Sequence, residues 1–374
     1  MSLRNARSCA RSVERPQPPP WQCIGYLFAG PWSCRTERSL CLVGPRPPRA
    51  VGVGHSGGKV RVSSTAQLTP DVTAGIPVTG EYVHKVDVSE VLLTEARATG
   101  ADTYRISADW PRSHGFYTSR HGLHDPLLLA ETVRQTVPLL SHAGYGAPFG
   151  HRQSWSSLNY ALTPAALAVG EGDTEVELRI ACQDVVRRSG RLASMNLQIE
   201  VLRDGIRVGT ARTRFANHAP ALYERLRGPY ADLARATSRA LPPAPPVEPA
   251  RVGREHPADV VLAASDVPGR SRLRVDLSHP VLFDHPVDHA PGMLLLEAAR
   301  QAAQAVAHPR PVVAVGMDTL FARYCELDVP CWIHAGLLDS PDRSTTRAVV
   351  SLVQNDLCVF SSVITLMEIP GAGA

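Results

Sequence analysis

Two segments of the chain place the same acid and the same base on one face of a predicted helix. LHDPLLLAETVRQTVPLL contains Glu131 and Arg134, and DHAPGMLLLEAARQAAQAV contains Glu297 and Arg300. Side chains three residues apart on a helix are neighbours, so each glutamate can pair with its arginine. Such a pair could supply a base for a hydroxyl proton and a guanidinium for an anion. It could equally be an ion pair with only a structural role.

Loops rich in histidine and aspartate precede both helices. They contain His121, His124 and Asp125 before the first helix, and Asp284, His285, Asp288 and His289 before the second. These side chains could line a polar site or shape the turns, and Asp125 could cap the first helix. The His and Asp spacing in the second loop could suggest a metal site, but no third ligand follows at a suitable spacing. We therefore expect neither a metal nor a cofactor.

The elements that must position these residues occur twice. Three pairs of segments align in the same order: Glu90–Pro111 with Asp259–Pro280, the two helices with each other, and Glu200–Phe215 with Ser351–Leu366. Matches in the same order indicate an internal duplication. Each copy predicts a period-2 strand, at residues 103–110 and 272–279, then a Pro/His-rich loop and one long apolar helix. The strands that follow end in a hairpin, with turns at residues 203–205 and 354–356. One buried helix against a long antiparallel sheet is an α+β architecture, with helices expected near 125–142 and 291–307.

Composition divides the chain into four parts. Residues 1–75 are rich in proline and arginine without a sustained period, which is typical of a disordered tail or of an over-extended gene start. The stretch LPPAPPVEPA has the composition of a semi-rigid linker. We therefore predict a tail at 1–75, a first repeat at 76–235, a Pro-rich linker at 236–255 and a second repeat at 256–370.

Charge and apolar content argue against several classes of protein. The formal net charge is +4, but residues 1–70 hold 10 basic and 2 acidic side chains, so the rest of the chain is mildly acidic. This balance argues against nucleic-acid binding by the main body. No apolar run is long enough to cross a bilayer, and the cysteines lack zinc-site spacing. We therefore expect a cytoplasmic protein without a membrane segment.

The order of elements and the helix start PGMLLLEA resemble the hotdog fold, including its hydroxyacyl-carrier-protein dehydratase branch. That branch places a catalytic histidine eight residues before the proline of Pro-Gly, where this chain has Phe283. The closer resemblance is to the A-factor biosynthesis (AfsA-type) hotdog family of γ-butyrolactone autoregulator synthases. Its motifs here are VHKVDVSEVLLT (83–94), WPRSHGFY (110–117), HDPLLLAETVRQ (124–135), YERLRG (223–228) and HPVLFDHPVDHAPGMLLLEAARQA (279–302).

This resemblance implies two hotdog repeats packed as a pseudo-dimer, with an active site near their seam. It implies an acyltransferase that moves a β-ketoacyl group from acyl carrier protein to the hydroxyl of dihydroxyacetone phosphate, the first step towards a γ-butyrolactone signal. In that site we predict Glu131 as the base, with Arg300 of the other repeat binding the phosphate or the developing charge. Glu297 and Arg134 are their pseudo-symmetric equivalents. Burial should raise the pKa of Glu131, while a nearby arginine should oppose this.

Several interpretations stay open at this level. The predicted substrate-binding residues of the two loops are His124, Asp125, His285, Asp288 and His289. An arginine run could dock the acidic carrier protein or form an ordinary exposed strand face; it comprises Arg187, Arg188, Arg191, Arg203, Arg207, Arg212 and Arg214. The alternative functions are a hotdog thioesterase or dehydratase that acts on acyl thioesters, and a non-catalytic binding module. The sequence also leaves a homodimer open.

Overall fold

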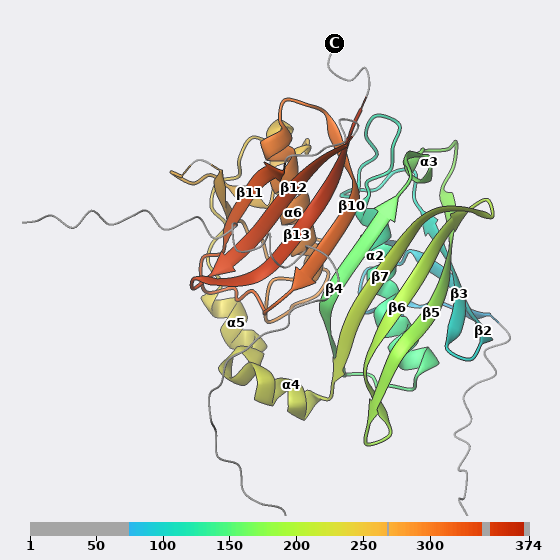
Figure 1. Cartoon of the computed structure of the whole chain (residues 1–374). Coiled ribbons are helices and arrows are strands. Elements are labelled where there is room, and N and C mark those ends of the chain that lie inside the picture. Colours follow the sequence, from blue (N-terminus) through green and yellow to red (C-terminus); the bar gives the residue numbers. More distant parts are fainter. Residues whose placement is uncertain (1–74, 268, 339–344, 370–374) are drawn as a thin grey trace, which may run out of the picture. The chain divides into compact units, whose positions relative to one another are not determined.

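The computed structural model describes residues 75–267, 269–338 and 345–369. The predicted tail, residues 1–75, lies outside the described residues except for Gly75. Within the described ranges, thirteen strands form one antiparallel sheet with helices against it (Figure 1). The predicted α+β class is therefore confirmed as a large antiparallel sheet with few helices. No helix among the described residues has the length and apolarity to cross a bilayer.

The first half, residues 75–240, contains the first long helix and the strands β1 to β7. The strands are β1 Ile76–Pro77, β2 Leu93–Gly100, β3 Thr103–Trp110, β4 Arg152–Leu162, β5 Thr174–Arg188, β6 Arg191–Arg203 and β7 Ile206–His218. The helices are α1 Gly80–Val83, α2 Leu127–Leu139, α3 Pro164–Leu167, α4 Pro220–Arg227 and α5 Leu233–Arg239, with short turns η2 Val88–Glu90, η3 Leu140–Gly144 and η4 Gly228–Ala231.

The second half, residues 241–369, contains the second long helix and the strands β8 to β13. The strands are β8 Leu262–Ala263, β9 Arg270–Leu273, β10 Val312–Phe321, β11 Trp332–Leu338, β12 Thr345–Gln354 and β13 Leu357–Glu368. The long helix is α6 Gly292–Ala307, preceded by the short turns η5 Pro249–Val252 and η6 Pro257–Asp259.

The two halves have the same strand order in the sheet. From the middle outwards the first half reads β4, β7, β6, β5, β3, β2, and the second reads β10, β13, β12, β11, β9, β8. The first half has one additional strand, β1, at its outer edge. The halves join where β4 pairs with β10, with Leu158 opposite Thr319. The duplication seen in the sequence therefore has a counterpart in the connectivity of the strands.

The helices α2 and α6 lie on the same side of the sheet and contact each other (Figure 1). Every residue of α2 except Arg134 is buried, because the sheet, α6 and the preceding loops enclose the helix. Pro138, near the end of α2, cannot donate a backbone hydrogen bond. α2 ends at Leu139, and the chain continues directly into a wider π-helical turn at Leu140–Gly144. The apolar run thus forms a core helix whose one partly exposed side chain is the arginine of the Glu–Arg pair.

Both predicted hairpin turns are confirmed. Strands β6 and β7 are joined through Asp204 and Gly205, and β12 and β13 through Asn355 and Asp356. All four residues have positive φ, between 50° and 74°. A two-residue type I′ turn requires this conformation, and Gly, Asn and Asp adopt it most readily.

One predicted strand is shorter in the structure. The strand expected over residues 272–279 ends at Leu273. Asp276 turns the chain there by accepting hydrogen bonds from the backbone and the hydroxyl of Ser278, at 3.0 and 2.6 Å. The strand therefore ends before the alternation of apolar and polar residues does, because the Asp276 side chain forms a turn with Ser278.

The segment predicted as a linker packs against the second half. The backbone N–H of Val247 donates to Leu262 at 3.0 Å, and that of Leu241 donates to Leu327 at 2.9 Å. Pro246 also forms an isolated β-bridge with Ala263. Proline-rich composition indicated the stiffness of this segment but not the surface that it covers.

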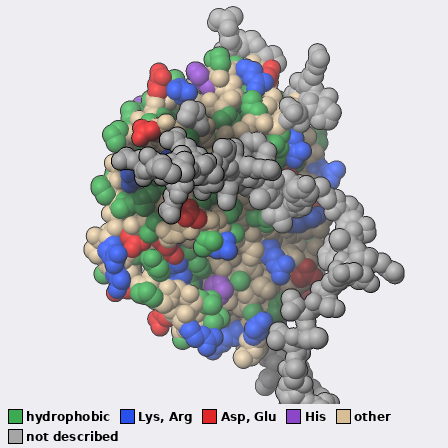
Figure 2. Space-filling model, turned by 60° about the vertical axis from the view of Figure 1, so that its left-hand side comes forward, with side chains coloured by type: hydrophobic (Ala, Val, Ile, Leu, Met, Phe, Trp, Pro, Cys, Tyr) green, Lys and Arg blue, Asp and Glu red, His purple; other side chains and the backbone are tan. Residues whose placement is uncertain are grey.

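The predicted arginine run lies on strands β5, β6 and β7, where all of its members except Arg203 are exposed. Acidic side chains such as Glu177 and Glu200 lie on the same strands. On the other side of the molecule, the side of the second half that Figure 2 turns forward, basic and acidic side chains are likewise interspersed over the described surface. The two interpretations of the run, carrier-protein docking and an ordinary exposed face, therefore both stay predictions.

Candidate active site

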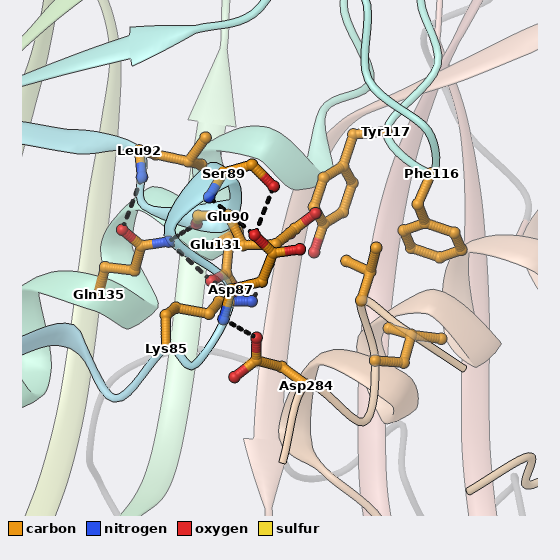
Figure 3. A network of polar contacts seen from close by, with 12 residues as sticks. Lys85, Asp87, Ser89, Glu90, Leu92, Phe116, Tyr117, Glu131, Gln135 and Asp284 are labelled. Carbon is orange, nitrogen blue, oxygen red and sulfur yellow. Dashed lines mark hydrogen bonds and ion pairs between the residues drawn. The ribbon is translucent and has the colours of Figure 1, made fainter. Parts of the chain in front are cut away.

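On α2 the carboxylate of Glu131 is buried and bound by three side chains. Arg134 Nε lies 2.9 Å from Oε2, Gln135 Nε2 donates to Oε1 at 2.9 Å, and Lys85 Nζ lies 3.3 Å from Oε1. Figure 3 shows Lys85 and Gln135 on either side of the acid. The Glu–Arg pair indicated by the sequence thus belongs to a larger buried network.

The charges around Glu131 decide its protonation state. Burial by itself would raise the pKa of the carboxyl, but Arg134 and Lys85 outweigh it and lower the pKa to about 2. A carboxylate with so low a pKa accepts a proton poorly near neutral pH. This environment does not fit the predicted role of Glu131 as the catalytic base.

Glu297 on α6 is held in the same way. Arg300 Nη2 lies 2.6 Å and Arg254 Nε 2.8 Å from its Oε1, and Gln301 Nε2 donates to the same atom at 2.5 Å. Burial would raise the pKa of Glu297, but the two arginines lower it to about 2. Arg254 occupies in this network the place that Lys85 has in the other.

Lys85 and Arg254 are the charged residues that the sequence reading missed. Arg254 follows Gly253, whose φ is 67° and where a Cβ would overlap the side chain of Gln304. Lys85 and Arg254 are separated by the same 169 residues as Glu90 and Asp259 in the repeated segments. Extending the alignment of the two repeats towards the N-terminus would have found them.

A shared bonding pattern ties each long helix to the turn before its first strands. Gln135 donates to the main-chain oxygen of Glu90 at 2.7 Å, and its own side-chain oxygen accepts a backbone N–H (Figure 3). Gln301 donates to the main-chain oxygen of Asp259 at 2.8 Å and also accepts a backbone N–H. The Glu–Arg–Gln set therefore has a structural role in both halves.

Two of the cavities in the described part of the chain combine the long helix of one half with the His/Asp loop of the other. The larger, about 470 Å³, is lined by Lys85, Glu131 and Arg134 together with Asp284, His285, Asp288 and His289. The smaller, about 270 Å³, is lined by His121, His124 and Asp125 together with Arg254, Arg300 and Gln304. The structure does not bring Glu131 and Arg300 into the lining of one cavity. Each arginine pairs with the glutamate on its own helix, and the two helices face different cavities.

In the larger cavity His289 and Asp288 form a hydrogen-bonded pair. His289 Nδ1 lies 2.7 Å from Asp288 Oδ1, and the hydroxyl of Tyr223 donates to the same carboxylate at 2.7 and 2.8 Å. Arg227 Nε lies 3.3 Å from Oδ2. Burial would raise the pKa of Asp288, but His289, Tyr223 and Arg227 lower it below its usual range. Asp288 is therefore a carboxylate placed to accept an N–H from Nδ1 and so to orient the imidazole ring.

Asp284 links the second loop to the first half. Its carboxylate accepts the backbone N–H groups of Val86 and Asp87 at 2.8 and 3.0 Å, as Figure 3 shows for Asp87. His285 Nδ1 lies 3.1 Å from the same carboxylate. The His/Asp loop is thus fixed against the residues beside Lys85, which holds it over the larger cavity.

The loop residues of the first half serve the start of α2. Asp125 accepts the backbone N–H of Leu127 at 2.9 Å, as predicted for a capping side chain. His124 Nε2 lies 2.9 Å from the hydroxyl of Thr174. In this half the predicted substrate-binding side chains are bound mainly by the protein itself.

The larger cavity also has a broad apolar wall and two further arginines. Its apolar lining includes Val137, Trp155, Val281, Met293, Leu295 and Phe321. Arg152, at the start of β4, and Arg323, just after β10, are exposed and line the same space. One compartment therefore offers contacts for an apolar chain and for an anion.

A long buried helix against a broad antiparallel sheet in each half, with cavities that both halves line, defines a protein of the hotdog class. A family model for the A-factor biosynthesis hotdog domain matches residues 66–217 and 235–368. The chain belongs to this family, and the resemblance seen in the sequence motifs is confirmed.

Curated relatives carry one name. The 2-oxo-3-(phosphooxy)propyl 3-oxoalkanoate synthase of Streptomyces virginiae is 44% identical over 76% of this chain and 95% of that protein. The synthases of that name from Streptomyces coelicolor and Streptomyces griseus are each 39% identical, over 80% and 77% of this chain and 95% of each relative. Among solved structures, an acyl-ACP thioesterase from Bacteroides thetaiotaomicron is 12% identical with a TM-score of 0.41, over 70% of this chain and 97% of that one. A likeness that distant carries no functional argument.

Proposed function

We propose that this chain is an acyltransferase that moves a β-ketoacyl (3-oxoacyl) group from acyl carrier protein to the hydroxyl of dihydroxyacetone phosphate. The product is a 2-oxo-3-(phosphooxy)propyl 3-oxoalkanoate, the compound in the name of the relatives. In the reaction the hydroxyl oxygen bonds to the thioester carbon, the carbon–sulfur bond breaks, and the thiol leaves with the proton.

The observation that carries this proposal is the composition of the larger cavity. Its apolar wall suits an acyl chain, and its volume of about 470 Å³ lies in the usual range for small-molecule sites. Arg152 and Arg323 supply guanidinium groups that match a phosphate. The His289–Asp288 pair supplies a base within the same space.

We assign the base to His289 rather than to Glu131. An imidazole held by a carboxylate at Nδ1 can take the hydroxyl proton at Nε2 and return it to the leaving thiolate. Glu131, with its pKa lowered to about 2, keeps its charge and holds Arg134 at the cavity wall instead. Arg134 can then stabilise the oxyanion that forms at the thioester carbon.

We further propose that residues 76–235 and 256–370 are tandem hotdog units that pack as a pseudo-dimer. The matching strand order of the two halves and the pairing of β4 with β10 support this arrangement. It would explain why each cavity takes its helix from one unit and its loop from the other.

A product assay tests the reaction. The chain is incubated with a β-ketoacyl carrier-protein thioester, with and without dihydroxyacetone phosphate, and the products are identified by mass spectrometry. We expect a phosphorylated ester that forms only when the acceptor is present. Free β-keto acid as the sole product would instead assign a thioesterase, and an unchanged thioester would assign a binding module.

The matched variants Arg152→Ala and Arg323→Ala test the assigned cavity. Because these arginines are exposed, both variants should fold, and the KM for dihydroxyacetone phosphate should rise about tenfold with little change in kcat. Unchanged KM values in both would place the acceptor elsewhere.

A further inference from the structure

The smaller cavity has a lining dominated by arginine. Five arginines line it, namely Arg120, Arg251, Arg254, Arg300 and Arg310. The one carboxylate among its lining residues, considering only the part of the chain that the structure describes, is Asp125. No mechanism proposed for the larger cavity uses these groups.

The acids near this cavity do not neutralise all of its arginines. Glu297 is shared by Arg254 and Arg300, and Arg254 also lies 3.7 Å from Asp125. Arg120 lies 4.0 Å from Glu255, and both of these side chains are exposed. Arg310 lies 2.8 Å from Glu368, but both side chains are about half exposed, so water screens the pair. Arg251 is exposed and forms no ion pair within the described ranges. The exposed side of the cavity therefore carries Arg251 without an acid, together with Arg120 and Arg310 in ion pairs that water screens.

Two residues that line the cavity each have a buried nitrogen atom without a hydrogen-bond partner among the described residues. These atoms are Nη2 of Arg254, whose side chain is 2% exposed, and Nδ1 of His124, a residue that is 1% exposed. A buried N–H without an acceptor costs free energy, and the cost is larger for a charged donor. The guanidinium of Arg254 is otherwise held by Glu297, Asp125 and the main-chain oxygen of Phe116, so its direction is set before any ligand binds.

We propose that the smaller cavity is a second ligand site that binds a small phosphate-bearing anion. Guanidinium groups form paired hydrogen bonds with phosphate oxygens, and the oriented Arg254 with the exposed Arg251 and Arg310 provides several such donors. The volume of about 270 Å³ suits a small phosphate ester better than a long acyl chain. This inference does not depend on acyl transfer in the larger cavity.

Calorimetric titration of the full chain with inorganic phosphate, at constant ionic strength, tests the proposal. The variant Arg251→Ala/Arg310→Ala removes two exposed arginines and should keep the melting temperature. We expect it to weaken one phosphate-binding event by about tenfold or more. The matched control is Arg152→Ala/Arg323→Ala in the larger cavity, which should leave that event unchanged.

The pattern of losses separates the two sites. A phosphate-binding event that persists in the control and is lost in Arg251→Ala/Arg310→Ala supports the second site, even if the larger cavity binds no phosphate at all. Binding heat that is the same in wild type and in Arg251→Ala/Arg310→Ala overturns it. Dihydroxyacetone, which lacks the phosphate, should not bind at this site, and equal binding of dihydroxyacetone would also overturn the assignment.

Discussion

The Glu131 and Glu297 networks are built alike but face cavities of different character. In each, a buried glutamate on the long helix binds an arginine and a glutamine of its own helix and a cation from the chain before it. The side chain of Arg134 is 22% exposed towards the larger cavity, whereas that of Arg300 is 5% exposed. The opposite loops differ more, because His289–Asp288 lines one cavity while Asp125 is used as a helix cap at the other. The Glu–Arg pair is thus common to both halves, whereas the loops that face the two cavities differ. In the mechanism proposed above, the base comes from the loop that the other half supplies.

The largest expected effect tests whether acyl transfer takes place in the larger cavity. His289→Gln should lower the rate of acyl transfer by roughly 10²–10⁴-fold, because it removes the general base without opening an apolar cavity. His121→Gln, an exposed histidine of the smaller cavity, is the matched control and should keep nearly full activity. Rates are measured by mass spectrometry of the phosphorylated ester. Equal losses in the two variants would show that the larger cavity is not the site of transfer.

Replacing each buried glutamate by glutamine should lower the free energy of unfolding by different amounts in the two networks. Glu297→Gln leaves Arg254 and Arg300 buried without their shared carboxylate, and we expect a loss of about 3–5 kcal/mol in the free energy of unfolding. Glu131→Gln should cost less, because the side chain of Arg134 is 22% exposed and water can solvate it, whereas that of Arg300 is 5% exposed. The second cations are matched, since Lys85 and Arg254 each keep another acid at 3.7 Å, Glu90 and Asp125. Urea denaturation measures both values. A larger loss for Glu131→Gln would reverse our ranking of the two networks.

The same carboxylates predict how stability depends on pH. Both have pKa values of about 2 in the folded chain, below the usual 4.5. A depressed pKa stabilises the folded state above about pH 4.5, and this stabilisation is lost as pH falls towards 2. Unfolding free energies measured over this window should fall more steeply for the wild type than for Glu131→Gln. Parallel curves would mean that Glu131 titrates normally.

The smallest expected effect on the transfer rate comes from removing a hydrogen bond to Asp288 of the His289–Asp288 pair. Tyr223→Phe removes the hydroxyl that donates to Asp288 and should weaken the network by about 1 kcal/mol, with a several-fold lower rate of transfer. Tyr230→Phe is the control, since Tyr230 is partly exposed and lies outside the lining of the larger cavity. Steady-state kinetics of both variants make the comparison. A rate for Tyr223→Phe equal to that of the control would remove Tyr223 from the positioning of His289.

The sequence by itself determined the features that depend on local pattern. Apolar periodicity and the repeated LLL–E–R–Q pattern predicted the two long helices within a few residues, and Asn, Asp and Gly at the turns predicted both hairpins. The internal offsets predicted two copies, and the motifs predicted the family. These signals are readable because side-chain periodicity and backbone conformation are short-range properties.

Only the tertiary structure decided which side chains meet. Sequence spacing allowed Glu131 to face Arg300, but the way the halves join places them in different cavities. It brings His289 and Asp288 into the lining of the same cavity as Glu131. The pKa of Glu131 also depended on Lys85, which lies 46 residues away in the chain and 3.3 Å away in space. Burial and charge act through distance in the folded molecule, and no local pattern contains that distance.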